Sequence, residues 1–168
     1  LRLQTMLTSS VGLHNVLEVA SKYDSRFLLA SSAAVYGRPS GGHRRFKEGE
    51  YGTFDRHATP STYDEGKRWA ETMGDAYRRV RNIDVRVGRI FRTFGPRMRL
   101  DDGHLVPDIV AKALDGDDVV VYGGPELFTT LAYVTDVVDG IVKLMELPED
   151  PGPVNIGSDI DVRVADVA

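Results

Sequence analysis

The chain has 168 residues, enough for one domain with a sizeable hydrophobic core. Its 21 Lys and Arg residues against 25 Asp and Glu leave no basic footprint for nucleic acid. The absence of cysteine excludes disulfides and thiolate metal sites, and the four histidines show no ligand spacing. No apolar run approaches the ~18 residues of a membrane span, and no signal-peptide pattern opens the chain. We therefore expect a cytoplasmic protein without nucleic-acid, membrane or metal partners.

The first half of the chain predicts a helix, a strand, a long loop and a second helix. Residues 3–22 have apolar side chains at helical spacing, as do the residues that follow Pro60. Residues 27–30 are apolar throughout, which is typical of a parallel strand covered on both faces. The loop at 38–60 is rich in glycine, proline and charge, which favours solvated over phosphate-binding arginines there. The stripe expected to be buried in the first helix consists of Leu3, Met6, Leu7, Val11, His14, Val16, Leu17 and Ala20.

The second half of the chain continues the alternation of strands and helices. A strand at 85–91 leads through a charged loop into a helix over 104–114, which Gly116 ends. The alternation predicts an α/β fold with a Rossmann-like parallel sheet and flanking helices. The remaining expected elements are a strand at 119–122, an extended segment at 131–134, a helix capped by Asp136, a strand at 154–157 and an element beginning at 159.

Tyr63 and Lys67 lie four residues apart at the start of the second helix and therefore share one of its faces. A free phenol ionises near pH ~10, and a neighbouring ammonium lowers such a pKa toward the range of a useful general base. The spacing alone is weak evidence, because about 0.2 accidental Tyr-x-x-x-Lys matches are expected in this composition. The competing interpretation is a tyrosine packed against the core beside a solvated lysine.

Two hydroxyl side chains, Ser31 and Ser32, follow the apolar strand at 27–30. Open α/β sheets bind their ligands at the carboxyl ends of the strands, so these hydroxyls are candidates for a site. The competing interpretation is a serine that only ends the strand or caps the next turn. With Tyr63 and Lys67 downstream, we favour the functional interpretation.

Three motifs in the chain, taken together, carry a resemblance to a known family. They are the strand ending in Ser31-Ser32-Ala33-Ala34-Val35-Tyr36-Gly37, then Tyr63-x-x-x-Lys67, then a second strand that runs into Gly95-Pro96-Arg97-Met98. In this order and spacing they resemble the extended short-chain dehydrogenase/reductase family, the NAD-dependent nucleotide-sugar epimerases, dehydratases and decarboxylases. The resemblance covers nearly the whole chain.

The resemblance implies a role for several residues. Tyr63 would be the acid/base, Lys67 would tune it and bind the nicotinamide ribose, and Ser32 would orient the proton transfer. The cofactor would be NAD, the substrate a UDP- or dTDP-linked sugar, and the helices at 3–22 and 63–82 would form a homodimer. The implied cofactor contacts are Ser31, Tyr63, Lys67 and Phe91, and the implied substrate contacts are Ser32, Ala33, Arg92, Val106 and Thr129.

Two positions depart from the family pattern. Ser9 stands where the family's Asn-x-x-Gly element has its Asn, although Gly12 is kept. Arg92 stands where the family usually has an Asn that contacts the nucleotide sugar. An arginine there could pair with a diphosphate bidentately, or it could block the usual pose.

The type of reaction depends on residues that the family varies. Dehydratases of the family carry an Asp-Glu pair before Val-Tyr-Gly and decarboxylases a Glu, but this chain has Ala33 and Ala34. The position of the decarboxylases' arginine is occupied by Thr129. These residues favour an epimerase-like second step, whereas other stretches, such as Tyr-Asp-Glu-Gly-Lys-Arg, are most similar to UDP-glucuronate decarboxylases. The alternatives are a decarboxylase or sugar 4,6-dehydratase relative, or a truncated, non-catalytic one.

No Gly-x-Gly-x-x-Gly motif occurs in the chain, so the turn that cradles a pyrophosphate is missing. By the resemblance, the sequence is about the middle half of a family member. We expect a single partial domain over 1–168, in which about 92–135 and 155–168 contribute to the substrate lobe. If the chain is truncated in this way, the strand at 27–30 would form an exposed edge of the sheet.

Overall fold

The computed structural model describes residues 2–37, 45–50, 52, 61–121 and 126–168. The predicted loop at 38–60 therefore falls largely outside the described residues. The chain divides into two compact units, Leu1–Ile90 with Gly140–Ile156 and Phe91–Asp139 with Gly157–Ala168. The predicted substrate-lobe segments fall largely in the second unit, and their role stays a prediction.

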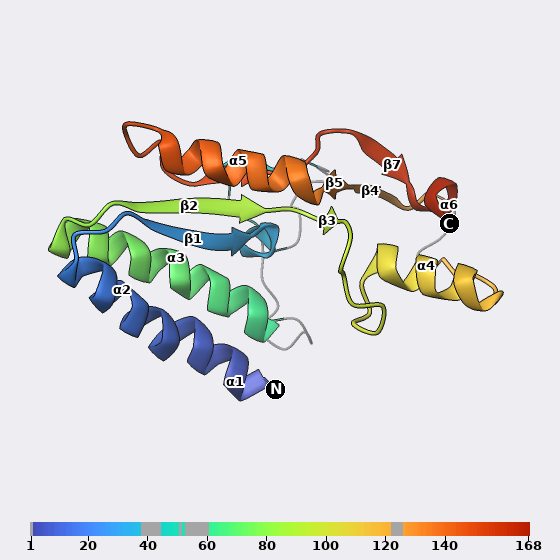
Figure 1. Ribbon diagram of the computed structural model, residues 1–168, viewed down its shortest axis with the longest axis horizontal. Helices are drawn as coiled ribbons and strands as arrows, with labels where there is room; N and C mark the ends of the chain where they lie inside the picture. The colour runs from blue at the N-terminus through green and yellow to red at the C-terminus, as the bar shows by residue number, and fades with distance from the viewer. Residues whose placement is uncertain (1, 38–44, 51, 53–60, 122–125) are drawn as a thin grey trace. The chain divides into compact units, whose positions relative to one another are not determined.

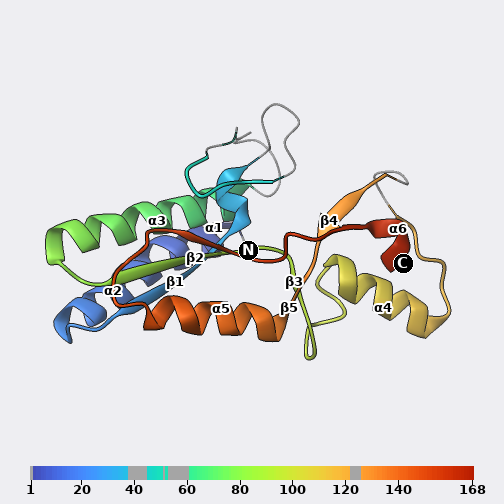
Figure 2. The same cartoon turned by 90° about the horizontal axis from the view of Figure 1, so that it is seen from above.

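The first unit is built on a parallel sheet of three strands in the order β1-β2-β6. Its strands are β1 (Phe27–Ser32), β2 (Val85–Ile90) and β6 (Val154–Ile156). Helices α2 (Leu13–Lys22) and α3 (Ser61–Arg81) cover one face of this sheet, and α5 (Val134–Glu146) lies on the other (Figures 1 and 2). The parallel α/β prediction is confirmed, and β1 is an edge strand of the sheet formed by the described residues.

Glycines allow close contact on both faces of β2. A Cβ on Gly74 of α3 would come 3.1 Å from Val85 Cγ1, and a Cβ on Gly88 would come 2.9 Å from Ile156 Cδ1. On the α3 side the core is a cluster made of Leu13, Leu17, Ala20, Leu29, Ala70, Ile83, Val85 and Val87. Burying such aliphatic side chains contributes about 1.5–3 kcal/mol each and holds α2 and α3 on the sheet.

The predicted helix at 3–22 is present, but its buried stripe is largely wrong. The helical run consists of α1 (Arg2–Leu7), a π-helical turn at Thr8–Gly12 and α2. A π turn takes up an extra residue, so the apolar side chains before it are rotated out of line with those after it. Leu17 and Ala20 are buried together with Leu13, which the prediction missed. Five of the predicted members are exposed by 37–72%: Leu3, Met6, Leu7, Val11 and Val16.

The second unit has short strands and two helices of its own. β3 (Thr93–Phe94) pairs in parallel with β5 (Ala132–Tyr133), and β4 (Phe128–Thr130) pairs antiparallel with β7 (Asp161–Arg163). The helices are α4 (Leu105–Asp115) and α6 (Val164–Val167). Gly116 ends α4 in a left-handed conformation with φ of 74°, as predicted.

Two predictions in this unit are wrong. Residues 119–121 form no strand, because no described segment pairs with them; their valines line a small apolar pocket beside α4 instead. Helix α5 begins at Val134, so Asp136 lies inside its first turn and is not its cap. A carboxylate in a first turn still interacts favourably with the helix dipole.

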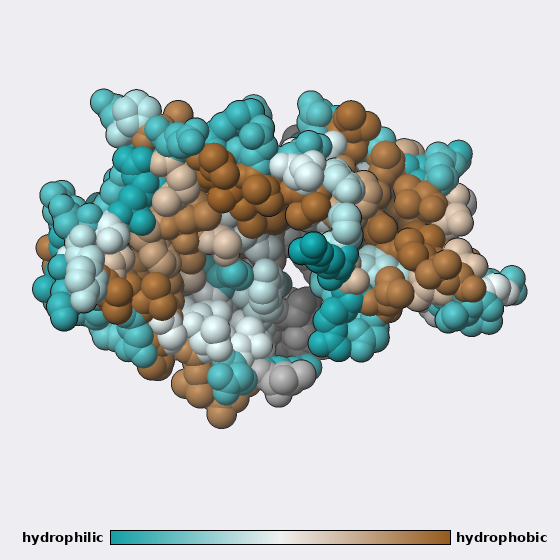
Figure 3. All heavy atoms as spheres, viewed as in Figure 1, coloured by the Kyte–Doolittle hydropathy of each residue, from teal (hydrophilic) through white to brown (hydrophobic). Residues whose placement is uncertain are grey.

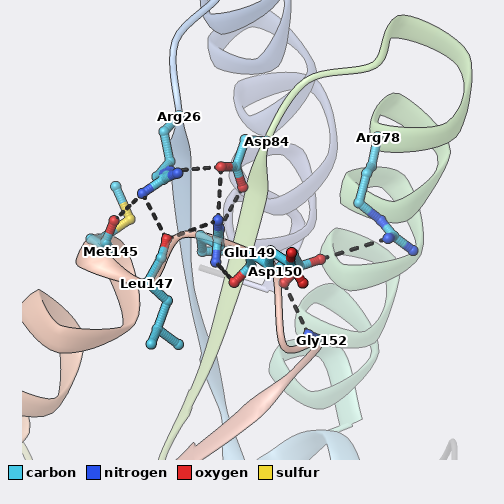
Figure 4. A network of polar contacts seen from close by, with 9 residues as sticks. Arg26, Arg78, Asp84, Met145, Leu147, Glu149, Asp150 and Gly152 are labelled. Carbon is cyan, nitrogen blue, oxygen red and sulfur yellow. Dashed lines mark hydrogen bonds and ion pairs between the residues drawn. The ribbon is translucent and has the colours of Figure 1, made fainter.

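A polar network holds the amino end of the sheet together. The guanidinium of Arg86, which is 1% exposed, donates to both carboxylate oxygens of Asp84, at 2.5 and 2.9 Å. Arg26, just before β1, donates to the same carboxylate at 2.6 Å (Figure 4). Arg26 also donates to the backbone carbonyls of Met145, at the end of α5, and Leu147. Arg86 donates to those of Leu147 and Glu149, between α5 and β6. This network fixes where the chain enters β1, β2 and β6.

Apolar side chains also reach the surface of the first unit. Brown hydrophobic atoms lie over α5 in the upper part of the space-filling view (Figure 3). Val142 on this helix is 46% exposed, and Leu147, just after it, is 40% exposed.

No helix among the described residues is long and apolar enough to cross a membrane.

Replacing Leu17 by Ala should lower the free energy of unfolding by about 2–5 kcal/mol. The Leu17 side chain is 0% exposed, so its removal would leave a cavity in the core. Urea unfolding followed by circular dichroism measures the loss. The matched control is Leu114→Ala on α4, whose side chain is 75% exposed, so the free energy of unfolding should change little. Equal losses for the two variants would contradict the packing described above.

Candidate active site

Tyr63 and Lys67 lie in the first turns of α3, which packs against the carboxyl-terminal part of β1. The Lys67 ammonium is 5.6 Å from the centroid of the Tyr63 ring. Its Nζ donates a 2.7 Å hydrogen bond to the carbonyl of Ala30 in β1. Helical spacing brings the phenol and the ammonium together, and the bond to Ala30 fixes both beside the strand end.

The environment of this pair contradicts the competing structural interpretation. Tyr63 is 45% exposed, so it does not pack into the core. Lys67 is half-buried, and desolvation by burial lowers the pKa of its ammonium below the ordinary value. A partly desolvated lysine beside an accessible phenol is the kind of pair that can move a proton to or from a ligand.

Ser32 ends β1 and begins a short 3-10 helix, η2 (Ala33–Tyr36). Its hydroxyl oxygen accepts a 3.2 Å hydrogen bond from the backbone N–H of Ala34, so Ser32 is the N-cap of η2. The prediction that Ser32 caps the next turn is therefore confirmed. This cap uses the hydroxyl only as an acceptor. A serine hydroxyl that accepts one hydrogen bond still has its proton to donate.

The structure brings Ser32, Lys67 and Tyr63 to one end of the first unit. Lys67 bonds the carbonyl of Ala30, two residues before Ser32 on the same strand, and Tyr63 is one helical turn away. The predicted substrate contact Ala33 opens η2 directly after Ser32. The predicted site residues of this unit thus surround the carboxyl end of β1, where α/β sheets bind ligands.

Ser31 is placed differently from its neighbour. Its side chain is 3% exposed, and its hydroxyl donates a 2.5 Å hydrogen bond to the carboxylate of Glu71 on α3. The Ser31 hydroxyl thus donates its proton to a partner inside the protein. Any contact of Ser31 with a cofactor would have to come from its backbone.

The structure also places Glu71, Arg89 and Tyr36 at this end of the sheet, none of which the sequence analysis selected. Arg89 donates to both oxygens of the Glu71 carboxylate, at 3.0 and 2.8 Å, and at 2.9 Å to the Tyr36 hydroxyl. Burial opposes the charge of Arg89, but the hydrogen bonds with Glu71 and Tyr36 outweigh it and raise its pKa. Two signals could have found the pair: Glu71 is four residues after Lys67, and Arg89 interrupts an apolar strand.

Ser9 lies in the π turn and packs against α3. A Cβ on Gly66 would come 2.8 Å from Ser9 Oγ, so the two helices approach closely there, one residue before Lys67. π turns occur often at functional sites, and this one places the position of the family's Asn beside α3.

The other predicted contacts belong to the second unit, and their roles stay predictions. Phe91 lies against Gly157, where a Cβ would come 2.7 Å from Phe91 Cβ. Arg92 has an exposed side chain, and its carbonyl accepts a 3.0 Å bond from the N–H of Ala132. Val106 lies in the first turn of α4, and Thr129 lies in β4, opposite Val162 of β7. Among the described residues, no group of three or more His, Asp or Glu could hold a metal ion.

Comparison with known proteins extends this description. Residues 2–157 match the model of the NAD dependent epimerase/dehydratase family. UDP-glucuronic acid decarboxylase 1 of Xenopus tropicalis is 41% identical over 156 residues, which are 93% of this chain and 36% of that protein. UDP-glucuronic acid decarboxylase 4 of Arabidopsis thaliana is 40% identical over 165 residues, 98% of this chain and 37% of that protein. The chain thus spans less than half the length of these relatives, and the predicted similarity to UDP-glucuronate decarboxylases is confirmed.

Solved structures agree on the fold. The UDP-N-acetylglucosamine 4-epimerase of Methanobrevibacter ruminantium superposes with a TM-score of 0.85 at 20% identity, over 96% of this chain and 50% of that one. The UDP-glucose 4-epimerase of Thermotoga maritima superposes with a TM-score of 0.84 at 24% identity, over 98% and 52% of the two chains. From the match of residues 2–157 and the identity to curated relatives, the chain belongs to the NAD-dependent epimerase/dehydratase family.

Proposed function

We propose that the protein is an NAD-dependent enzyme that oxidises a hydroxyl of a UDP- or dTDP-linked sugar and then completes an epimerase-like second step. The observation that carries the proposal is the half-buried Lys67 ammonium, bonded to Ala30 beside the exposed phenol of Tyr63. Ser32 lies two residues beyond Ala30, with a hydroxyl proton still to donate. These three groups are the parts that a proton transfer from a sugar hydroxyl requires.

Each of the three side chains has a separate role in the proposed reaction. Tyr63 removes the proton of the sugar hydroxyl, and the positive charge of Lys67 favours the phenolate over the phenol. Ser32 donates its hydroxyl proton toward the sugar oxygen and holds it in line with Tyr63. Bound NAD would supply the hydride acceptor for the carbon that carries this oxygen.

The residues present fit only part of the cofactor. Tyr63 and Lys67 offer polar groups at the carboxyl end of β1, which suits the nicotinamide ribose. Ser31 and Phe91 are the other proposed cofactor contacts. The chain contains no glycine-rich turn for the pyrophosphate. That part of NAD would need residues outside the sequence described.

The residues around Ser32 support the epimerase-like second step. Ala33 and Ala34 follow it in η2, so no carboxylate is available there to remove water or to act on a carboxylated sugar. Thr129 stands at the position of the family's decarboxylating arginine. The proposed substrate contacts are Ser32, Ala33, Arg92, Val106 and Thr129, of which Arg92 could pair with the diphosphate.

Two alternatives remain. The 41% identity to UDP-glucuronic acid decarboxylase 1 of Xenopus tropicalis favours a decarboxylase relative. The second alternative is a truncated, non-catalytic family relative, which would retain no NAD on purification.

We also propose a homodimer in the cytoplasm. Helices α1 to α3 expose large apolar side chains, with Leu3 72%, Val11 55%, Trp69 53% and Val80 79% accessible, and such side chains favour a partner surface. The cysteine-free sequence fits a reducing compartment. A solution mass of one chain would contradict the dimer.

Tyr63→Phe in the full protein should lower turnover of a UDP-sugar by about 10²–10⁴-fold, because it removes the acid/base group. Circular dichroism should be unchanged, because the Tyr63 side chain is 45% exposed. Coupled NADH absorbance and product analysis measure turnover. Turnover equal to that of the unmodified protein would reject the role of Tyr63.

The contribution of Lys67 to stability should depend on pH. Because the pKa of Lys67 is lowered in the folded chain, the unfolded chain binds more protons at alkaline pH. Its contribution to the free energy of unfolding should therefore increase as pH rises through the folded pKa toward the ordinary value of about 10.4. Urea unfolding from pH 7 to 10 should show this increase relative to Lys67→Met. Parallel curves for the two proteins would contradict the burial of the ammonium.

The product of UDP-glucuronic acid distinguishes the two catalytic alternatives. NMR of the reaction should show an epimer that keeps its carboxylate, with no UDP-xylose, because Ala34 and Thr129 replace the decarboxylating residues. Release of carbon dioxide would support the decarboxylase relative instead. If the protein neither retains NAD nor converts any UDP- or dTDP-sugar tested, the non-catalytic alternative holds.

A further inference from the structure

Glu71 connects three elements at the carboxyl end of the sheet. It lies on α3, and its carboxylate accepts hydrogen bonds from Ser31 of β1 and from Arg89 of β2. Its side chain is 15% exposed and that of Arg89 is 8% exposed, so little water competes for these bonds. Bidentate pairing with a planar guanidinium fixes the carboxylate in direction as well as in distance.

Arg89 is itself held on several sides. Its Nη1 donates to the Tyr36 hydroxyl at 2.9 Å and to the Glu48 carbonyl at 2.8 Å, and its guanidinium carbon is 4.8 Å from the centroid of the Tyr36 ring. The Tyr36 hydroxyl then donates to Asn155 Oδ1 of β6 at 2.6 Å. With so many fixed partners, Arg89 cannot follow a shift of Glu71 without breaking other bonds.

The sheet register aligns these contacts. Ser31 of β1 pairs with Arg89 of β2, and Arg89 pairs with Asn155 of β6, so the three residues form one row across the sheet. Glu71 on α3 contacts Ser31 and Arg89 of this row. Tyr36 connects Arg89 with Asn155. The row lies immediately before Ser32, the last residue of β1.

On the helix, Glu71 continues the stripe of the proposed site. Tyr63, Lys67 and Glu71 are spaced by four residues, so they lie along one face of α3. Lys67 bonds Ala30 and Glu71 bonds Ser31, so two successive turns of α3 are attached to two successive residues of β1. Of these two attachments, the one at Glu71 is buried and reinforced by an arginine.

We propose that Glu71, held by Arg89, is a positioning residue. It fixes where α3 lies along β1 and thereby places Tyr63 and Lys67 opposite Ser32. The inference rests on the proposed function, since it concerns the alignment of those three groups. Glu71 touches neither substrate nor cofactor in this account. A displacement of about 1 Å in a catalytic group can cost on the order of 10²-fold in rate, so a small slip of the helix would be visible.

The test variant is Glu71→Gln, and the chain offers a matched control. Asp84→Asn removes the carboxylate partner of the other buried arginine of β2, Arg86, at the opposite end of the same strand. Both variants weaken an arginine–carboxylate pair on β2, but only Glu71→Gln disturbs the attachment of α3 to β1.

In the full protein, Glu71→Gln should lower kcat about 10- to 100-fold with little change in KM for the UDP-sugar. Asp84→Asn should keep kcat within about threefold when both variants are assayed below their unfolding transitions. Equal losses of kcat in the two variants would show a merely structural role, and an unchanged kcat in Glu71→Gln would also overturn the proposal. Should Glu71→Gln fail to fold, Ser31→Ala decides: it cuts only the link from Glu71 to β1 and must lower kcat more than Asp84→Asn does.

Amide hydrogen exchange supplies a readout that needs no activity. Glu71→Gln should speed exchange selectively in residues 30–36 and 61–71, whereas Asp84→Asn should speed it near 84–86 and 145–150. The same pattern in both variants would overturn the positioning role. If the unmodified protein shows no turnover, the proposed function fails, and the exchange comparison still decides whether Glu71 fixes α3 on β1.

Discussion

The buried ion pair between Glu71 and Arg89 is the interaction on which the arrangement of the candidate site depends. Taking two charges out of water is unfavourable, so such a pair forms only where each charge finds further partners. Here Ser31 donates to Glu71, and Tyr36 and the Glu48 carbonyl accept from Arg89. Among the described residues, every buried side-chain nitrogen or oxygen has a hydrogen-bond partner. Removing one member of such a pair commonly costs about 3–5 kcal/mol, which makes the alternative positions of α3 unfavourable.

The two buried arginines of β2 each hold one end of the sheet of the first unit through hydrogen bonds. Arg86, with Asp84 and Arg26, fixes the amino end by holding the backbone that leads into β6. Arg89 fixes the carboxyl end, where Ser32 and Lys67 lie. Between them, Leu29, Val85 and Val87 form the apolar centre that packs on α2 and α3. The sheet therefore has a structural end and an end whose side chains remain available to a ligand.

Local patterns predicted the elements that depend on local chemistry. The apolar spacing after Pro60 correctly predicted a helix, although Trp69 and Val80 of its expected buried face are exposed. The apolar run of β1 and the end of α4 at Gly116 also correspond to the structure. The spacing of Tyr63 and Lys67 predicted that both lie on one face of the helix. The distance of 5.6 Å between the Lys67 ammonium and the centroid of the Tyr63 ring agrees with this prediction.

The errors arose where a residue's state depends on a distant partner. Residues 119–121 have strand-like side chains, but no described strand pairs with them. The π turn at Thr8–Gly12 has no simple sequence signal, and it turned Leu3 and Leu7 away from the core. The hydrogen bond between Ser31 and Glu71 also could not be predicted, because the two residues are forty positions apart in the sequence. Such a pairing becomes visible only once α3 lies on β1.

The most direct test of the account is a crystal structure of the full protein with NAD and a UDP-sugar. The account predicts that the Tyr63 hydroxyl lies within hydrogen-bond reach, about 2.6–3.2 Å, of one sugar hydroxyl that Ser32 also contacts. Lys67 should contact the nicotinamide ribose while it remains bonded to Ala30. A sugar bound away from the carboxyl end of β1, with Tyr63 facing solvent, would contradict the catalytic assignment.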